Sequence, residues 1–280
     1  MKITFWGTRG SIPAPGPYTA AIGGNTTCIE IETNTRTRII IDAGTGIRPL
    51  GLKLVRESNP DHMILLLTHS HWDHLAGFTF FLPAYKENFS IDVYGHPPAQ
   101  ELLQRDIFEE HDNRYFPVKM NNFRAKIRIF NPFPDPLVIK DLHISRINLN
   151  HPGNGYGYRF TQGDRSFAFI TDNEIGMGYE GGNSSDELIE FCRGCHYLIH
   201  DGQYLPEEIE EHRGWGHSTY EEVLDIAHQA QVPNVILTHH DPERDDNHCW
   251  TLLERAREYI HKNRYQINCE LAIESQSHIL

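Results

Sequence analysis

The run His69-Ser70-His71-Trp72-Asp73-His74 places four potential metal ligands within six positions. It directly follows the apolar segment His62–Leu67, whose length and composition are typical of a buried strand. Alternate residues of an extended chain share a face, so the first two histidines point to one side. The aspartate and the last histidine point elsewhere, because we expect the chain to turn into a helix near Leu75. The run therefore predicts two adjoining ligand sets, which suits two cations roughly 3.5–4 Å apart.

Together with Thr68, this run resembles the signature of the metallo-β-lactamase superfamily, whose other positions can be matched in chain order. Asp42, in Asp42-Ala43-Gly44, matches an aspartate that supports the site from behind the ligands. His151 matches the third histidine of the first metal, and Asp172 matches the aspartate that bridges both metals. His239 matches the last histidine on the second metal. Each of these residues follows an apolar strand, as expected of ligands at the ends of a sheet.

The resemblance implies two divalent cations per chain, with Zn²⁺ preferred and Mn²⁺ or Fe²⁺ as alternatives. The first cation would be held by His69, His71, His151 and Asp172. The second would be held by Asp73, His74, Asp172 and His239, with His240 as the alternative to His239. Such a pair lowers the pKa of a shared water, so that hydroxide attacks the substrate. Asp73 is placed to orient that water or to take its proton.

A second motif, Gly216-His217-Ser218-Thr219, resembles the ribonuclease Z-like branch of the superfamily, as do the stretches 5–13 and 24–27. In that branch the histidine stabilises the scissile phosphate or protonates the leaving oxygen, and an acidic residue upstream holds it. Asp201 matches this residue, although ribonuclease Z usually has glutamate there. A carboxylate would fix the tautomer of His217, as a general acid requires. Ser218 or Thr219 is expected to cap the helix that follows.

The rest of the chain alternates strand and helix signals over one expected domain, residues 1–280. Helices are expected at 47–57, 98–108, 220–229 and 248–262. Strands outnumber helices, which suggests two packed sheets with helices outside. The resemblance implies the same α+β fold, a four-layer αββα sandwich with the metals at one edge between the sheets. The irregular stretch 108–123 is expected to form a surface loop or a lid.

Composition limits the function. The formal net charge is −13, which repels a long phosphate backbone and makes a dedicated nucleic-acid binder less favoured. The N-terminus is strand-like without a signal-peptide pattern, and no apolar run reaches the roughly 20 residues of a membrane helix. Five cysteines without framework spacing suggest reduced thiols in a cytoplasmic protein. The CxxC at Cys192 and Cys195 is expected to be two thiols at a helix end, with a zinc or redox role as the alternative.

The interval between His151 and Asp172 is short, and a hairpin over 156–170 is expected to fill it. The long arm with which ribonuclease Z grips transfer RNA is absent from this interval. We therefore expect a phosphodiesterase acting on a small phosphodiester, in particular a cyclic nucleotide, whose base the loops near 15–18 and 114–116 would contact. The alternatives are a ribonuclease Z-like RNA endonuclease, a thioester or lactone hydrolase, and a non-catalytic metal- or nucleotide-binding module. The resemblance also implies a homodimer.

Overall fold

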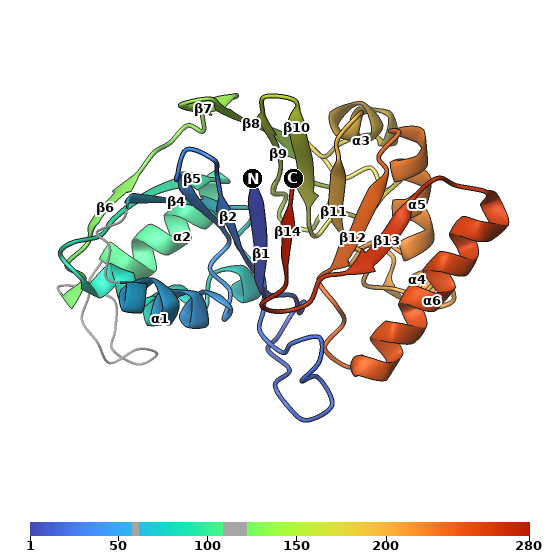
Figure 1. Ribbon diagram of the computed structural model, residues 1–280, viewed down its shortest axis with the longest axis horizontal. Helices are drawn as coiled ribbons and strands as arrows, with labels where there is room; N and C mark the ends of the chain where they lie inside the picture. Colours follow the sequence, from blue (N-terminus) through green and yellow to red (C-terminus); the bar gives the residue numbers. More distant parts are fainter. Residues whose placement is uncertain (58–61, 109–121) are drawn as a thin grey trace.

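Two mixed β-sheets of seven strands each form the centre of the computed structural model, which describes residues 1–57, 62–108 and 122–280 (Figure 1). In spatial order, the first sheet contains β14 (Ser277–Ile279), β1 (Lys2–Gly7), β2 (Cys28–Glu32), β3 (Arg38–Ile41), β4 (His62–Leu67), β5 (Ser90–Gly95) and β6 (Lys126–Ile129). The second contains β13 (Asn268–Leu271), β12 (Asn234–Thr238), β11 (Tyr197–Asp201), β10 (Arg165–Ile170), β9 (Tyr156–Gln162), β8 (Leu142–Asn148) and β7 (Leu137–Ile139).

Each sheet is half parallel and half antiparallel. In the first sheet, β3, β4, β5 and β6 pair in parallel, and the strands from β14 to β3 pair antiparallel. In the second sheet, β10 to β13 pair in parallel and β7 to β10 antiparallel. Because the carboxyl ends of neighbouring parallel strands meet at one edge, the residues after β4, β10, β11 and β12 are brought to the edge where ligands bind in α/β sheets.

The central strands are buried on both faces, which explains why they are apolar without interruption. In β10, Phe167 and Phe169 enter the core between the two sheets, whereas Ala168 and Ile170 face the helices of the second sheet. The same alternation in β4 directs Ile64 and Leu66 inward. A period of two residues therefore supplies both the core between the sheets and an outer core beneath the helices.

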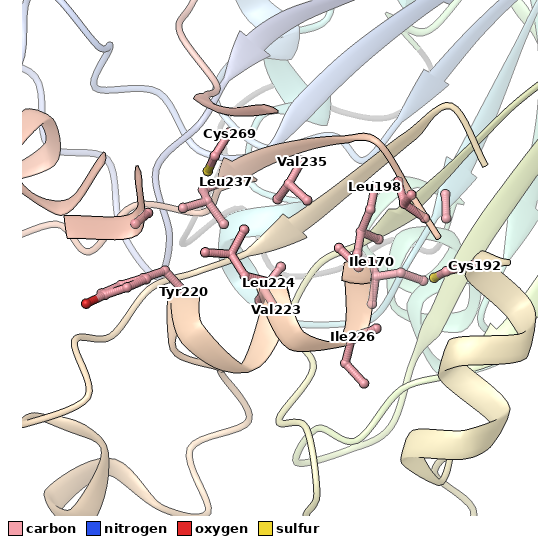
Figure 2. Packing of buried hydrophobic residues seen from close by; sticks show 14 of the residues in the cluster. Ile170, Cys192, Leu198, Tyr220, Val223, Leu224, Ile226, Val235, Leu237 and Cys269 are labelled. Atoms are coloured by element: carbon pink, nitrogen blue, oxygen red, sulfur yellow. The ribbon is translucent and has the colours of Figure 1, made fainter. Parts of the chain in front are cut away.

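Helices cover both outer faces of the sheet pair (Figure 1). The helices are α1 (Ile47–Glu57), α2 (Pro97–Phe108), α3 (Ser185–Cys192), α4 (Ile209–His212), α5 (Tyr220–Gln229) and α6 (Asp246–Asn263). Residues of α1 and α2 pack on the first sheet, and those of α3, α5 and α6 pack on the second. Figure 2 shows Val223 and Leu224 of α5 on the side of the helix that faces Val235 and Leu237 of β12.

The predicted four-layer α+β sandwich is confirmed. The helix expected near Leu75 is wrong: short 3-10 turns at Trp72–His74, Phe78–Phe80 and Leu82–Tyr85 occupy that segment. The backbone there makes only the short-range bonds of these turns and also bonds to the loop after β3, since Ala43 N–H donates to the carbonyl of His74 and Gly77 N–H donates to that of Ala43. A Cβ at Gly77 would also overlap the Gly44 carbonyl, so only glycine permits this close approach.

The structure also tests predictions for segments outside the run His69–His74. The interval after His151 is filled by β9 and β10, as expected. The stretch 108–123 and the segment 114–116 lie largely or wholly outside the described residues. Cys192 ends α3, and all five cysteines are buried and free, as expected for structural thiols. Among the described residues, no helix is both long and apolar enough to cross a bilayer.

Candidate metal centre

The candidate ligands lie where strands end. His69 follows β4, Asp172 follows β10 and His239 follows β12. The backbone is left-handed at Asp172 (φ 57°), at His239 (φ 56°) and at Asp42 after β3 (φ 61°). This conformation costs a residue with a side chain about 1–2 kcal/mol, and aspartate and histidine adopt it more often than most. Three strand ends thus carry a residue with an unfavourable left-handed backbone. We take this to mean that the contacts these residues make in the site stabilise that conformation.

Seven side chains converge at this edge as two adjoining groups, and within each group the ligand atoms lie within 4.8 Å of one another. The first group is His69, His71 and His151, and the second is Asp73, His74, Asp172 and His239. Asp172 joins the two groups, because its Oδ2 lies 3.3 Å from Nε2 of His69 and 3.2 Å from Nε2 of His74. The structure thus brings together all seven predicted ligands, with Asp172 between the two groups.

The polar atoms at the centre fit divalent cations. Nε2 of His69 and Nε2 of His74 are buried and make no hydrogen bond to any described residue, although Asp172 lies within ion-pair distance of both. Nδ1 of His71 and Nε2 of His151 face each other at 2.9 Å. A buried polar atom without a partner costs about 1–3 kcal/mol. Cations held between these imidazoles and carboxylates would satisfy them with ligands that zinc prefers.

A second layer of contacts orients the histidine rings. Nδ1 of His74 lies 2.8 Å from Asp42 Oδ2, and Nδ1 of His239 lies 2.8 Å from Gln203 Oε1. Nδ1 of His151 lies 3.0 Å from the Gly216 carbonyl. Each acceptor takes the proton on Nδ1 and leaves the Nε2 lone pair facing the centre, as is usual for metal-binding histidine. The sequence indicated the role of Asp42, but not those of Gln203 and the Gly216 carbonyl.

The first group is neutral at physiological pH. Burial lowers the pKa of His69 well below its usual value and that of His151 to about 4. Burial also lowers the pKa of His71, although this residue is more exposed to solvent than the other two. Neutral imidazole is the form that binds metal, so these three residues are ready to do so without losing protons.

The second group is strongly charged. Burial opposes protonation of His74, but the carboxylates of Asp73, Asp172 and Asp42 outweigh it and raise the pKa of His74 well above its usual value. Burial also opposes ionisation of Asp172, yet His239 and His74 hold the pKa of that carboxyl well below its usual range. These carboxylates also raise the pKa of His239, and a cation bound here would take the place of the protons that they favour on the two histidines.

His217 and Asp201 form a pair at the rim of the two groups. Nδ1 of His217 lies 3.2 Å from Asp201 Oδ2, which also accepts the backbone N–H of Ser218 at 3.2 Å. Burial opposes ionisation of Asp201, but His200 and His217 hold the pKa of its carboxyl well below its usual range. One ring nitrogen of His217 lies within 4.8 Å of the ligand atoms of His151 and Asp172. Asp201 thus orients His217 toward the site. The shorter side chain of aspartate is long enough for this contact, although ribonuclease Z usually has glutamate at the matching position.

The N-terminal loop closes the site from the other side. The Ser11 N–H donates to Asp73 Oδ2 at 2.9 Å. Gly10 lies against the ring of His239, where a Cβ would overlap Nδ1. The glycine at this position therefore permits a close approach to a ligand of the second group, and the backbone beyond it orients Asp73.

His240 lies outside both groups. Its Nε2 is 3.0 Å from the Ala272 carbonyl, and burial lowers its pKa to about 3. It is therefore a neutral core histidine, and of the two adjacent candidates the structure places His239 in the site.

Gly216 offers a direct test of how His151 is held. Gly216 has a φ of 88°, and a Cβ there would overlap Nδ1 of His151. We expect Gly216→Ala to push the His151 ring out of the first group and to weaken binding at that group by roughly 10–100-fold, the usual loss when an outer partner is removed. Zinc affinity from competition with a chelating dye measures the change.

Gly194 is the matched control for this variant. It lies outside the loop that holds His151, with a φ of 69°, and a Cβ there would meet nothing within 4 Å. Gly194→Ala should therefore carry the backbone strain alone and keep normal zinc affinity. Equal zinc affinity in the two variants would show that the overlap with His151 does not matter.

Comparisons with known proteins agree with this architecture. The family model described as "Beta-lactamase superfamily domain" matches residues 37–240. Among curated relatives, ribonuclease Z from Nitrosopumilus maritimus (strain SCM1) is 23% identical over 282 residues, which cover 85% of this chain and 89% of the relative.

Solved structures show the same likeness along the whole chain. The metallo-beta-lactamase fold protein YhfI from Bacillus subtilis has a TM-score of 0.72 at 18% identity and covers 99% of this chain and 98% of its own. Yeast PDE1 has a TM-score of 0.70 at 15% identity and covers 100% of this chain and 99% of its own. Since the family match spans most of the sequence and the predicted fold is present, the chain belongs to the metallo-β-lactamase superfamily of metal-dependent hydrolases.

Proposed function

We propose that this protein is a dinuclear metal-dependent phosphodiesterase that hydrolyses a small phosphodiester, with a cyclic nucleotide as its preferred substrate. The observation that carries the proposal is the His217–Asp201 pair beside the two ligand groups. A hydrolase needs a proton donor when the leaving group is an alkoxide, and a histidine oriented by a buried carboxylate supplies one. A thioester or lactone hydrolase has less need of this pair.

The residues divide the work by position. The seven side chains of the two groups would hold two divalent cations, which when bound lower the pKa of water and offset negative charge on a phosphate. Asp73, whose Oδ2 also accepts the Ser11 N–H, is placed to orient the attacking water or accept its proton. Asp201 holds His217 at its Nδ1, so the other ring nitrogen is free to deliver a proton to the leaving oxygen.

The size of the substrate is inferred from the short connection between two site residues. β9 ends at Gln162 and β10 begins at Arg165, so a tight turn joins them between His151 and Asp172. This interval has no room for an RNA-gripping arm, and the net charge of −13 disfavours a polyanion. A small phosphodiester needs neither feature.

A second candidate is an RNA endonuclease, favoured by the relatives that bear the name ribonuclease Z. Turnover of cyclic mononucleotides, cyclic dinucleotides, bis-p-nitrophenyl phosphate and a structured transfer RNA precursor, measured side by side on zinc-loaded protein, separates the two. Cleavage of the RNA alone would overturn the small-substrate proposal. Binding of metal without turnover of any phosphodiester would indicate a non-catalytic module, and turnover of thioesters or lactones alone would indicate that class of hydrolase.

Size-exclusion chromatography with light scattering tests the expected homodimer.

Two exposed tryptophans adjoin the metal centre and suit a nucleobase. Trp72 lies between His71 and Asp73 and is 67% exposed, and Trp215 precedes Gly216 and is 60% exposed. Stacking of a base on an aromatic ring contributes roughly 1–3 kcal/mol. Tyr18, in a loop from which base contacts were expected, is also exposed.

We expect Trp72→Ala to raise KM for a cyclic nucleotide about 5- to 100-fold and to leave kcat within a factor of about three, because stacking binds the base without touching the phosphate. Steady-state kinetics on a purine and a pyrimidine cyclic nucleotide measure the effect, which should be larger for the purine. Trp250→Ala on α6, where the tryptophan is 39% exposed, is the control. An unchanged KM in Trp72→Ala would remove Trp72 from the binding site.

A further inference from the structure

We infer that Glu174 is a positioning residue: its buried carboxylate holds the segment Gly214–His217 in the shape that orients His151 and presents His217 to the site. The inference deepens the proposed function and rests on it. Glu174 follows Asp172 by two positions and is fully buried. The two ligand groups do not include it, and neither does the His217–Asp201 pair.

The Glu174 carboxylate is a focus of hydrogen bonds. It accepts the backbone N–H of Gly214 at 3.0 and 3.1 Å and that of Gly216 at 3.0 Å. The hydroxyl of Tyr179 donates to it at 3.1 Å, and Nη1 of Arg213 lies 3.7 Å away. Three donors therefore converge on one side chain, and the two oxygens of a carboxylate offer enough acceptor sites to meet them all.

The shape of the loop explains why its N–H groups need such an acceptor. Gly214 and Gly216 both have a φ of 88°, so the segment belongs to no helix or strand. The N–H groups of Gly214 and Gly216 both point at the buried carboxylate of Glu174, and that of Gly216 is itself buried. An unpaired buried N–H costs about as much as a lost hydrogen bond, so removing the acceptor favours a different loop shape.

The shape of the segment Gly214–His217 affects the site through two of its residues. The Gly216 carbonyl takes the proton on Nδ1 of His151, at 3.0 Å. His217 follows Gly216 directly, and its ring reaches the ligand atoms of His151 and Asp172. A second contact reinforces the link, since Ser218 Oγ donates to the Asn173 carbonyl at 2.6 Å and accepts the Ile175 N–H at 3.0 Å. These bonds connect Ser218, next to His217, with the two neighbours of Glu174 in the chain.

The test is Glu174→Gln, which keeps the size of the side chain and replaces one acceptor with a donor. We expect kcat on a cyclic nucleotide to fall roughly 10-fold or more, and zinc affinity at the first group to fall by a similar factor. We also expect most of the loss in kcat to vanish when His217 is already alanine, because residues that act as one unit are not additive. Glu180→Gln, at an exposed glutamate of the same connection, is the matched control.

Three measurements test the inference: zinc affinity, the tautomer of His151, and kcat with and without His217→Ala. The nitrogen NMR signals of the histidines in metal-free protein report whether His151 still carries its proton on Nδ1, independently of turnover. Unchanged zinc affinity and an unchanged tautomer would overturn the inference, as would equal losses in kcat with and without His217. If Glu174→Gln does not fold, Glu174→Asp, which retracts the carboxylate and keeps its charge, is compared in the same way. If wild-type protein cleaves no phosphodiester, the proposed function fails, while zinc affinity and the tautomer still test Glu174.

Discussion

Asp172→Asn is expected to lose both metal loading and turnover. The change removes the carboxylate that lies between the two ligand groups and keeps the shape of the side chain. Asparagine also tolerates the left-handed backbone at this position, whereas alanine would add strain. Loss of an outer partner of a ligand typically costs 10–100-fold, so loss of a bridging ligand should lower kcat by more than about 10³-fold. Zinc per chain by atomic emission and turnover of bis-p-nitrophenyl phosphate measure the two effects.

Two further variants serve as an intermediate case and a control for Asp172→Asn. Gln203→Ala removes only the acceptor behind His239 and should fall in the range of about 10–100-fold. Asp164→Asn, at a largely exposed aspartate in the turn between β9 and β10, should change nothing. Full zinc occupancy together with normal kcat in Asp172→Asn would contradict the assignment of Asp172 as the shared ligand.

The candidate site could be predicted because its ligands are tied to strand ends. Asp42, His69, Asp172 and His239 each follow an apolar run, and apolar runs are the clearest signal in a sequence. The order of these residues along the chain also matches the superfamily, which the structure and the comparisons confirm as the fold. The fold and the gathering of these side chains were predictable because local sequence and position in the fold depend on the same residues, whereas metal binding by them stays a prediction.

The remaining features depend on contacts between segments far apart in the chain. Gln203 faces His239 only because β11 and β12 end side by side, and Glu174 meets Gly214 only after the loop has folded back. The helix expected near Leu75 failed for the same reason, since that backbone bonds to the loop after β3. The start of α3, which the sequence analysis did not locate, has a local signal, a capping box of Ser184 and Glu187.

His217→Ala is expected to separate the two roles that the sequence left open for this residue. If His217 protonates the leaving oxygen, kcat on a cyclic nucleotide should fall about 10²- to 10⁴-fold, the usual contribution of general acid catalysis. The same variant should lose less than about 10-fold on bis-p-nitrophenyl phosphate, because p-nitrophenolate is a stable anion and leaves without a proton. Steady-state kcat on both substrates, with zinc content checked in each preparation, gives the comparison.

The pattern across the two substrates identifies the chemistry. A residue that only stabilises charge on the phosphate lowers kcat on both substrates alike, since both carry that charge in the transition state. Asp201→Asn should reproduce the pattern of His217→Ala to a smaller extent, because it leaves the ring in place and removes the carboxylate that fixes its tautomer. His143→Ala, at an exposed histidine of β8, controls for loss of a ring elsewhere. Normal turnover of both substrates by His217→Ala would remove the observation on which the phosphodiesterase proposal depends and would favour a thioester or lactone hydrolase with the same metal ligands.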